Sequence, residues 1–191
     1  MSLLVLLLIA SLVFALHSSM AEPSKEEMAA LMARFKEAAE PSAPHAWLAK
    51  LAGEWILETT SPMQGGSKTQ GKVSAKMIQG GRFLQEELTS EWMGGTVTRI
   101  QVLGYDNVQA KYLTTSTASN STSIFFGQGT RDESTGVLTI HTPIHDPMTP
   151  EGRMSRTVVT YPNSDEQHIQ VYDTQGDREV LVVEMTMRRC Q

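Results

Sequence analysis

The chain lacks several features that would assign it to a particular class of protein. Its single cysteine among 191 residues is Cys190, so no disulfide can form within the chain and packing must stabilise the fold. The 16 Lys and Arg are outnumbered by 21 Asp and Glu, and they form no basic cluster. Because nucleic-acid binding requires such a cluster, we expect no nucleic-acid partner. The sequence leaves open whether Cys190 pairs between chains, and it leaves the oligomeric state open too.

The motifs of common catalytic and cofactor sites are also missing. The chain has no G-x-S-x-G, phosphate-binding glycine loop, H-E-x-x-H or C-x-x-C. Their absence removes the usual grounds for proposing a reaction, and we expect no cofactor. It does not exclude catalysis, so the sequence favours a protein without enzymatic activity and leaves an enzyme as the alternative.

The N-terminal residues 1–21 have the composition of a secretory signal peptide. Their apolar run is shorter than the roughly 17–25 residues of a membrane-spanning helix. Small residues at Ser19 and Ala21 predict cleavage near Ala21, and hence a secreted or periplasmic protein with no membrane span after cleavage. A signal peptide usually has a Lys or Arg between its first residue and the apolar run, and none occurs here. An uncleaved anchor or a mis-assigned start codon is therefore the alternative.

Residues 22–44 predict an amphipathic helix and a linker. Ser24 and Glu27 form a capping box at the start. Apolar residues then recur at helical spacing, at Met28, Leu31, Met32, Phe35 and Ala39. The polar face has no Lys/Arg excess, which favours a helix docked on the domain or a loose extension over one that binds a membrane or a partner. The segment PSAP, residues 41–44, predicts a short linker.

Residues 45–191 predict one all-β domain. After a helical turn in AWLAKL, short alternating segments are separated by turn residues and no crossover helix intervenes. This pattern favours an antiparallel up-and-down barrel of about ten strands, whose closure removes exposed sheet edges. The predicted strands cover residues 54–61, 69–79, 82–92, 96–104, 110–117, 122–130, 136–142, 153–161, 166–173 and 179–188.

Four segments of this region resemble a known bacterial family, designated domain of unknown function 1579 (DUF1579). They are HAWLAKLAGEW at 45–55, GGRFLQEE at 80–87, LGYDN at 103–107 and EMTMRR at 184–189. The resemblance covers roughly residues 45–189. It implies a calycin-like barrel, related in shape to lipocalins and fatty-acid-binding proteins. It implies no reaction, because the activity of the family is not established.

The G-x-W pattern at Gly53 to Trp55 is also a lipocalin mark. In lipocalins the Trp packs across the closed end of the barrel and a late Arg stacks on it. The resemblance therefore implies a structural role in barrel closure for Trp55 together with Arg188, or with its neighbour Arg189.

One predicted strand places charges on an apolar face. Alternate residues share a face, so the expected interior set is Arg82, Leu84, Glu86 and Leu88. A buried charge needs a partner, and the last strand offers Glu184. If Arg82 meets Glu86 or Glu184 inside the barrel, the group would orient the polar head of a ligand whose tail contacts the leucines. The alternative is an ionic cluster that closes the barrel or lies at its rim.

The segment HTPIHDPMTPE, residues 141–151, contains the metal-ligand types His141, His145 and Asp146. Pro143 forbids a helix, and an extended strand would hold the two histidines about 13 Å apart. Only a tight loop could bring them together. We therefore expect a surface loop and no metal, and retain these three residues as the metal candidates.

These observations favour a barrel that binds a small amphipathic or hydrophobic molecule. One alternative is an enzyme with its site in the barrel mouth, which would gather Tyr105, Asp106 or the histidines in one cleft with shifted pKa values. A turn at Asp106 is the simpler interpretation of that pair. The other alternative is a filled structural or envelope-stress barrel without a ligand.

Overall fold

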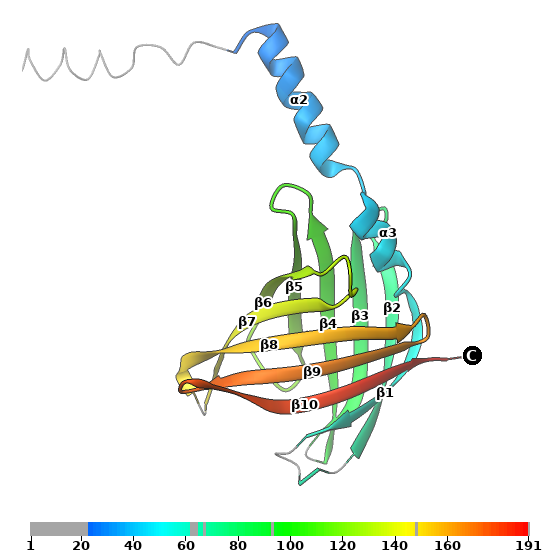
Figure 1. Ribbon diagram of the computed structural model, residues 1–191, viewed down its shortest axis with the longest axis vertical. Helices are drawn as coiled ribbons and strands as arrows, with labels where there is room; N and C mark the ends of the chain where they lie inside the picture. The colour runs from blue at the N-terminus through cyan, green and yellow to red at the C-terminus, as the bar shows by residue number, and fades with distance from the viewer. Residues whose placement is uncertain (1–22, 62–64, 67, 93, 148, 191) are drawn as a thin grey trace, which may run out of the picture. The chain divides into compact units, whose positions relative to one another are not determined.

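The structure, a computed structural model, describes residues 23–61, 65–66, 68–92, 94–147 and 149–190 (Figure 1). The predicted signal peptide and its cleavage site near Ala21 lie outside the described residues. Among the described residues, no helix is long and apolar enough to cross a membrane. The chain divides into two units, one ending at Glu40 and one beginning at Pro41.

The first unit contains helix α2 (Lys25–Ala39). Its predicted capping box is confirmed: Ser24 Oγ accepts from the Glu27 backbone N–H at 3.1 Å, and Glu27 Oε2 accepts from the Ser24 N–H at 2.7 Å. These two bonds satisfy N–H groups that the first helical turn cannot pair internally.

The second unit contains a closed antiparallel barrel of ten strands, in which consecutive strands pair and β1 pairs with β10. The predicted barrel of about ten strands is confirmed. The strands are β1 (Gly53–Thr60), β2 (Lys68–Ile78), β3 (Phe83–Trp92), β4 (Gly95–Asp106), β5 (Lys111–Ala118), β6 (Phe125–Arg131), β7 (Leu138–Asp146), β8 (Thr149–Asn163), β9 (Glu166–Gln175) and β10 (Arg178–Arg189).

The main departure from the predicted strands concerns residues 141–151. The expected surface loop is wrong: β7 continues to Asp146 and β8 begins at Thr149. Pro143 is tolerated inside β7 because β6 pairs with β7 only as far as Gln128 opposite His141. Beyond that point no described residue pairs with this edge of β7, and such an edge accommodates proline.

Helix α3 (Ala43–Ala49) defines one end of the barrel, which we call the helix end. It begins inside the predicted linker, and Pro44 occupies its first turn, where proline costs no hydrogen bond. Ser42 Oγ donates to Asn107 Oδ1 at 2.8 Å and so ties α3 to the β4–β5 turn. The β1–β2, β3–β4, β5–β6, β7–β8 and β9–β10 connections lie at the opposite end, which we call the far end.

The inner face of strand β6 has few side-chain atoms. Gly127 and Gly129 occupy successive inward positions, opposite Thr114 and Tyr112 of β5. A Cβ at Gly129 would overlap the backbone carbonyl of Thr139 in β7. Glycine is therefore required at Gly129 for β6 and β7 to approach this closely.

Candidate functional site

Trp55 and Arg189 close the helix end. Trp55 is 1% exposed, and its indole N–H donates to the Leu51 carbonyl at 3.1 Å. The guanidinium of Arg189 lies 4.2 Å from the Trp55 ring centroid and donates to the carbonyls of Ala52 at 2.7 Å and Lys50 at 2.8 Å. These contacts combine a cation–π interaction with charge-assisted hydrogen bonds.

The closure role that was assigned to Arg188 is therefore wrong for that residue and belongs to Arg189. Register decides between the neighbours, because Trp55 lies directly opposite Arg189 in the β1–β10 pair. Arg188 points outwards and bonds Glu166 at 3.4 Å. Gly53 completes the arrangement, since its φ is +139° and a Cβ would overlap the Arg189 guanidinium.

Aromatic rings fill the barrel next to this closure. Trp47 packs edge-on against Tyr112 and Tyr161, with ring centroids 5.4 Å and 5.3 Å away. Burial raises the pKa of Tyr112 to about 12 and also raises the pKa of Tyr161. Both hydroxyls therefore stay neutral at physiological pH.

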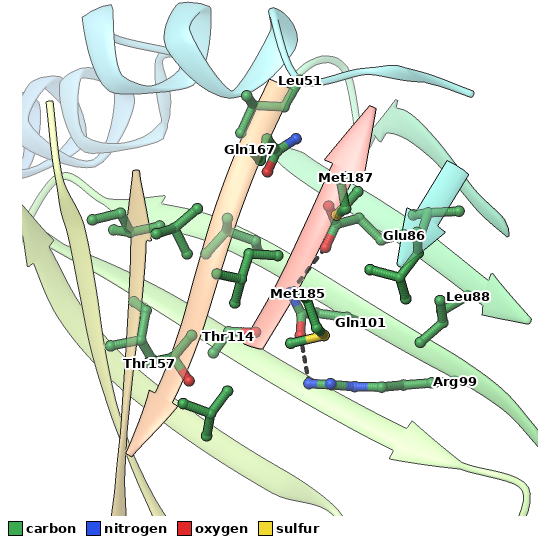
Figure 2. Close-up of a pocket in the computed structure, with 18 of the residues that line it drawn as sticks. Leu51, Glu86, Leu88, Arg99, Gln101, Thr114, Thr157, Gln167, Met185 and Met187 are labelled. Carbon is green, nitrogen blue, oxygen red and sulfur yellow. Dashed lines mark hydrogen bonds between the residues drawn. The ribbon is translucent and has the colours of Figure 1, made fainter. Parts of the chain in front are cut away.

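A cavity of about 160 Å³ lies inside the barrel beyond these rings (Figure 2). Most of its wall is aliphatic and is contributed by Leu51, Leu57, Val73, Leu88, Leu103, Leu138, Ile140, Val159, Ile169, Val171, Met185 and Met187. Its polar lining consists of Glu86, Arg99, Gln101, Thr114, Thr142, Thr157, Tyr161 and Gln167. An apolar space with a few convergent polar groups is the usual form of a small-molecule site.

Three of the polar groups form a chain across β3 and β4. Arg99 Nη2 donates to Gln101 Oε1 at 2.7 Å, and Gln101 Nε2 donates to Glu86 Oε2 at 2.9 Å (Figure 2). Arg99 Nη2 also donates to Ser116 Oγ at 3.2 Å. The Gln101 amide thus stands between the cation and the carboxyl group, and Arg99 bonds only neutral acceptors among the described residues.

Burial controls the electrostatics of this chain. It raises the pKa of Glu86, and the smaller opposing effects are the charge of Arg99 and the hydrogen bond from Gln101. Burial also lowers the pKa of Arg99, with Glu86 acting in the other direction. An arginine starts above about 12 and stays protonated in proteins. Arg99 lines the cavity and is nevertheless exposed to solvent.

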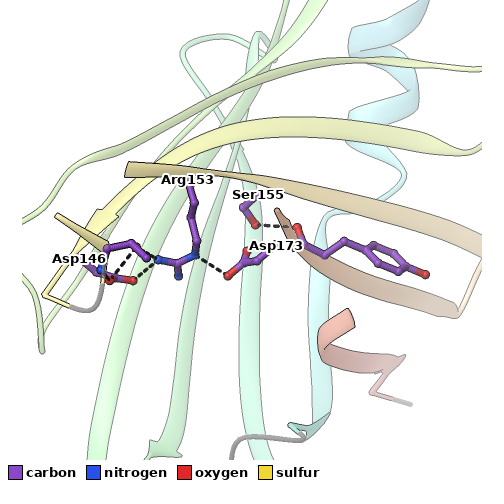
Figure 3. Close-up of polar contacts among 6 residues, drawn as sticks. Asp146, Arg153, Ser155 and Asp173 are labelled. Atoms are coloured by element: carbon purple, nitrogen blue, oxygen red, sulfur yellow. Dashed lines mark hydrogen bonds and ion pairs between the residues drawn. The ribbon is translucent and has the colours of Figure 1, made fainter. Parts of the chain in front are cut away.

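A second arginine faces inwards near the far end and is fully paired there (Figure 3). Arg153, whose side chain is 17% exposed, donates through Nε to Asp173 Oδ2 at 2.6 Å and through Nη1 to Asp146 Oδ2. Burial opposes the charge of Arg153, but the bonds to both carboxylates outweigh it and raise the pKa of Arg153. This cluster joins the end of β7 to β8 and β9.

The residues predicted for the interior separate into two groups. Leu84 and Glu86 point inwards, Leu84 being fully buried, and Leu88 lines the cavity. The interior placement of Arg82 and Glu184 is wrong. Arg82 precedes β3, and its Nη1 donates to the Gln79 and Gly80 carbonyls of the turn.

Glu184 lies on the outer face of β10. It is between Met185, which lines the cavity, and Val183, and its carboxylate accepts from Gln170 Nε2 at 3.2 Å. The apolar run of β10 takes the inner face, since burying Met185 and Met187 is favourable and burying an unpaired carboxylate is not.

The metal candidates do not converge. His141 and His145 both lie exposed on the outer face of β7, and Asp146 is engaged by Arg153 and by the Thr149 N–H at 2.9 Å. No group of three metal-ligating side chains occurs within the described part of the chain.

The other catalytic candidates have structural roles. Asp106 Oδ1 accepts from the N–H groups of Val108 at 2.7 Å and Gln109 at 3.0 Å, which confirms the predicted turn. These bonds lower the pKa of Asp106. Tyr105 points the other way and packs on His45, with ring centroids 5.9 Å apart.

Sequence reasoning missed Arg99, Gln101, Arg153 and Asp173. The alternation in β4 was available as a signal, but it is ambiguous: Ile100 and Val102 lie on one face, and Arg99, Gln101 and Leu103 lie on the other.

Comparisons with known proteins agree with the barrel. No curated protein matches the chain. Among solved structures, the S-type phycobiliprotein lyase CPES from Guillardia theta is similar, with a TM-score of 0.50 and 9% sequence identity over 78% of this chain and 94% of that one. At this identity the likeness shows the fold alone. Residues 40–189 match the family described as "Protein of unknown function (DUF1579)", and the chain therefore belongs to that family.

Proposed function

We propose that this protein binds a small amphipathic molecule inside the barrel. The observation that carries the proposal is the cavity itself, an aliphatic space that the side chains leave unfilled and into which charged and polar groups point. Thr114 Oγ1 and Gln167 Nε2 add support. Both atoms are buried at the cavity and have no hydrogen-bond partner among the described residues, so a ligand or water that bonds them would remove a cost.

The cavity volume limits the size of the ligand. A dry engineered cavity of about 150 Å³ in another protein holds benzene, and the present cavity measures about 160 Å³. Pockets that bind larger, drug-like ligands measure roughly 300–1,000 Å³. We therefore propose a ligand with a short chain or a single ring, unless the flexible side chains of Met185 and Met187 move aside.

Filling the cavity should weaken ligand binding. In Val171→Phe the added ring enters the space that a ligand needs, and we expect the affinity for 1-hexanol to fall at least about tenfold. Isothermal titration calorimetry measures the change. Val158→Phe is the matched control, because Val158 lies on the outer face of β8 between the cavity residues Thr157 and Val159. A wild-type protein that binds neither hexanol, hexanoate nor benzene would contradict the proposed function.

The two alternatives have less support. A filled structural barrel would leave no aliphatic space of this size. An enzyme of the kind considered above would bring Tyr105, Asp106 and the histidines into one cleft, whereas His141 and His145 lie on the outer face and Asp106 caps a turn. The phycobiliprotein lyase has a similar fold, and this likeness shows only that a barrel of this fold occurs in another protein that is described as a lyase.

We also propose that the chain is exported, on the strength of the apolar N-terminal run and the small residues Ser19 and Ala21. Expressed at full length in a secreting bacterial host, the protein should appear outside the cytoplasm with Glu22 as its first residue in N-terminal sequencing. Ala21→Leu should accumulate as the uncleaved precursor. Recovery of wild-type protein in the cytoplasm with its first residues intact would contradict this proposal.

A further inference from the structure

Building on the proposed function, we propose that the ligand is a small anionic amphiphile, a monocarboxylate. Its carboxylate binds Arg99, and its apolar tail extends along the aliphatic wall towards the helix end.

Arg99 is a cation at the cavity wall, and no described residue is a direct anionic partner for it. Both of its hydrogen bonds leave from Nη2 and end on neutral oxygens, those of Gln101 and Ser116. Among the described residues no carboxylate forms an ion pair with it, because Glu86 reaches it only through the Gln101 amide. Arg99 is exposed, so water reaches its guanidinium, and a carboxylate that binds the remaining N–H groups would form charge-assisted hydrogen bonds beside the apolar wall of the cavity.

Arg153 shows what the same side chain does when the protein supplies its own counter-charge. There Asp146 and Asp173 both bind the guanidinium directly (Figure 3). Both arginines occupy inward positions of their strands, but Arg153 is partly buried and bound by two carboxylates, whereas Arg99 is exposed and has no carboxylate bound to it among the described residues. A ligand supplies that carboxylate.

The rest of the cavity suits the tail of such a ligand. Arg99 is four residues from the start of β4 at the far end, whereas Gln167 is one residue from the start of β9 at the helix end. In Figure 2 the labelled side chains of Arg99 and Gln167 lie at opposite sides of the pocket, with Met185 between them. Most of the wall is aliphatic, so a head bound at Arg99 leaves the tail in apolar surroundings.

Glu86 makes this site sensitive to pH. The groups that act on Glu86 electrostatically are Arg99 on β4 and Tyr161 on β8, while β2 and β10 contribute the uncharged Val73 and Met185 to the same cavity. Because burial raises the pKa of Glu86, its carboxyl stays neutral at a higher pH than an exposed one. When Glu86 ionises, its charge compensates Arg99 and repels a ligand carboxylate. Anion binding therefore weakens as the pH rises through this pKa, and binding takes up protons.

The experiment compares two probes that differ only in the head group, hexanoate and 1-hexanol, by isothermal titration calorimetry on the full chain. Wild-type protein should bind hexanoate at least about tenfold more tightly than 1-hexanol, because the carboxylate gains charge-assisted bonds. Arg99→Met should weaken hexanoate about 100-fold and leave 1-hexanol nearly unchanged. Arg156→Met is the matched control, since it removes the same charge from the outer face, where Arg156 pairs with Glu179.

A pH series with Glu86→Gln gives a readout that does not depend on the arginine variant folding. The wild-type affinity for hexanoate should fall with rising pH, and Glu86→Gln should abolish this fall. Titrations in buffers of different ionisation enthalpy should show proton uptake for the wild type and a smaller uptake for the variant.

The outcomes separate the two proposals. Equal affinity for both probes, unchanged in Arg99→Met and flat with pH, would overturn the monocarboxylate inference and leave the proposed binding function standing. Failure of both probes, with Val171→Phe and the wild type indistinguishable, would overturn both. A preference for hexanoate that is lost in Arg99→Met and kept in Arg156→Met supports the inference.

Discussion

Replacing Arg189 with alanine should destabilise the barrel by about 3 kcal/mol. The substitution removes the cation that covers Trp55 and leaves the carbonyls of Lys50 and Ala52 without their donors. Hydrogen bonds from charged groups contribute about 1.5–3 kcal/mol each, and a cation–π contact adds about 0.5–2 kcal/mol. Because the Arg189 side chain is 25% exposed, water replaces part of this, and we take a value near the low end of the sum. In thermal unfolding the loss corresponds to roughly 6–12 °C.

The neighbouring arginine provides the control. Arg188 is 62% exposed and forms one ion pair, with Glu166 at 3.4 Å. Exposed pairs of this kind contribute at most about 1 kcal/mol, so Arg188→Ala should change stability by less than about 0.5 kcal/mol. Urea unfolding of both variants measures the difference. Equal losses would show that the contacts of Arg189 do not hold the helix end together.

Replacing Gly129 with alanine should have an effect of similar or greater size. The new methyl group would overlap the backbone carbonyl of Thr139, and a backbone atom cannot turn away as a side chain can. Relief of the overlap requires β6 to separate from β7 where Gly129 pairs with Ile140. Overpacking typically costs about 1–3 kcal/mol, and we expect about 3 kcal/mol or more because paired backbone must move.

Gly95→Ala is the matched control for Gly129→Ala. At Gly95 the nearest heavy atom to an added Cβ is the Trp92 carbonyl oxygen at 4.0 Å, which is an ordinary contact. Alanine there should be neutral or slightly stabilising, within about 1 kcal/mol, since it restricts the unfolded chain. Calorimetric unfolding compares the two variants with the wild type. Equal stability of Gly129→Ala and Gly95→Ala would mean that β6 and β7 are not held as closely as the structure describes.

The barrel could be predicted from the sequence because its rules are local. Turn residues and alternation located ten strands, and the capping box located α2. The prediction of the closure residue failed, because strand register decides which of two neighbouring arginines lies opposite Trp55. Arg188 and Arg189 have the same chemistry, and only the pairing of Trp55 with Arg189 selects the second.

The candidate site could be predicted only in part. In β3 the inner residues Leu84 and Leu88 flank Glu86, and the other face is polar apart from Phe83, so Glu86 was placed correctly. In β4 apolar residues occur on both faces, and alternation does not reveal that Arg99 points inwards. Its lack of a directly bound carboxylate depends on how side chains of β3, β4 and β5 are placed relative to one another, which the pattern of a single strand does not contain.

The resemblance segments take on a different meaning once the fold is known. His45 packs on Tyr105, Phe83 packs over Gly104 and Arg189 covers Trp55, so parts of all four segments make contacts with one another near the helix end. These contacts build and close the barrel. In GGRFLQEE, Glu86 also reaches the cavity.

The bond from Arg189 to Ala52 has a consequence for the order of folding during synthesis. It joins residues 137 positions apart, and the β1–β10 pairs lie among the most distant in the chain. Such pairings form slowly, because a long loop must close before any contact rewards it. A nascent chain on the ribosome can therefore form hairpins such as β3–β4, but both edges of its sheet stay open until β10 has been made. Until then those edges are available to chaperones and to other unfinished chains.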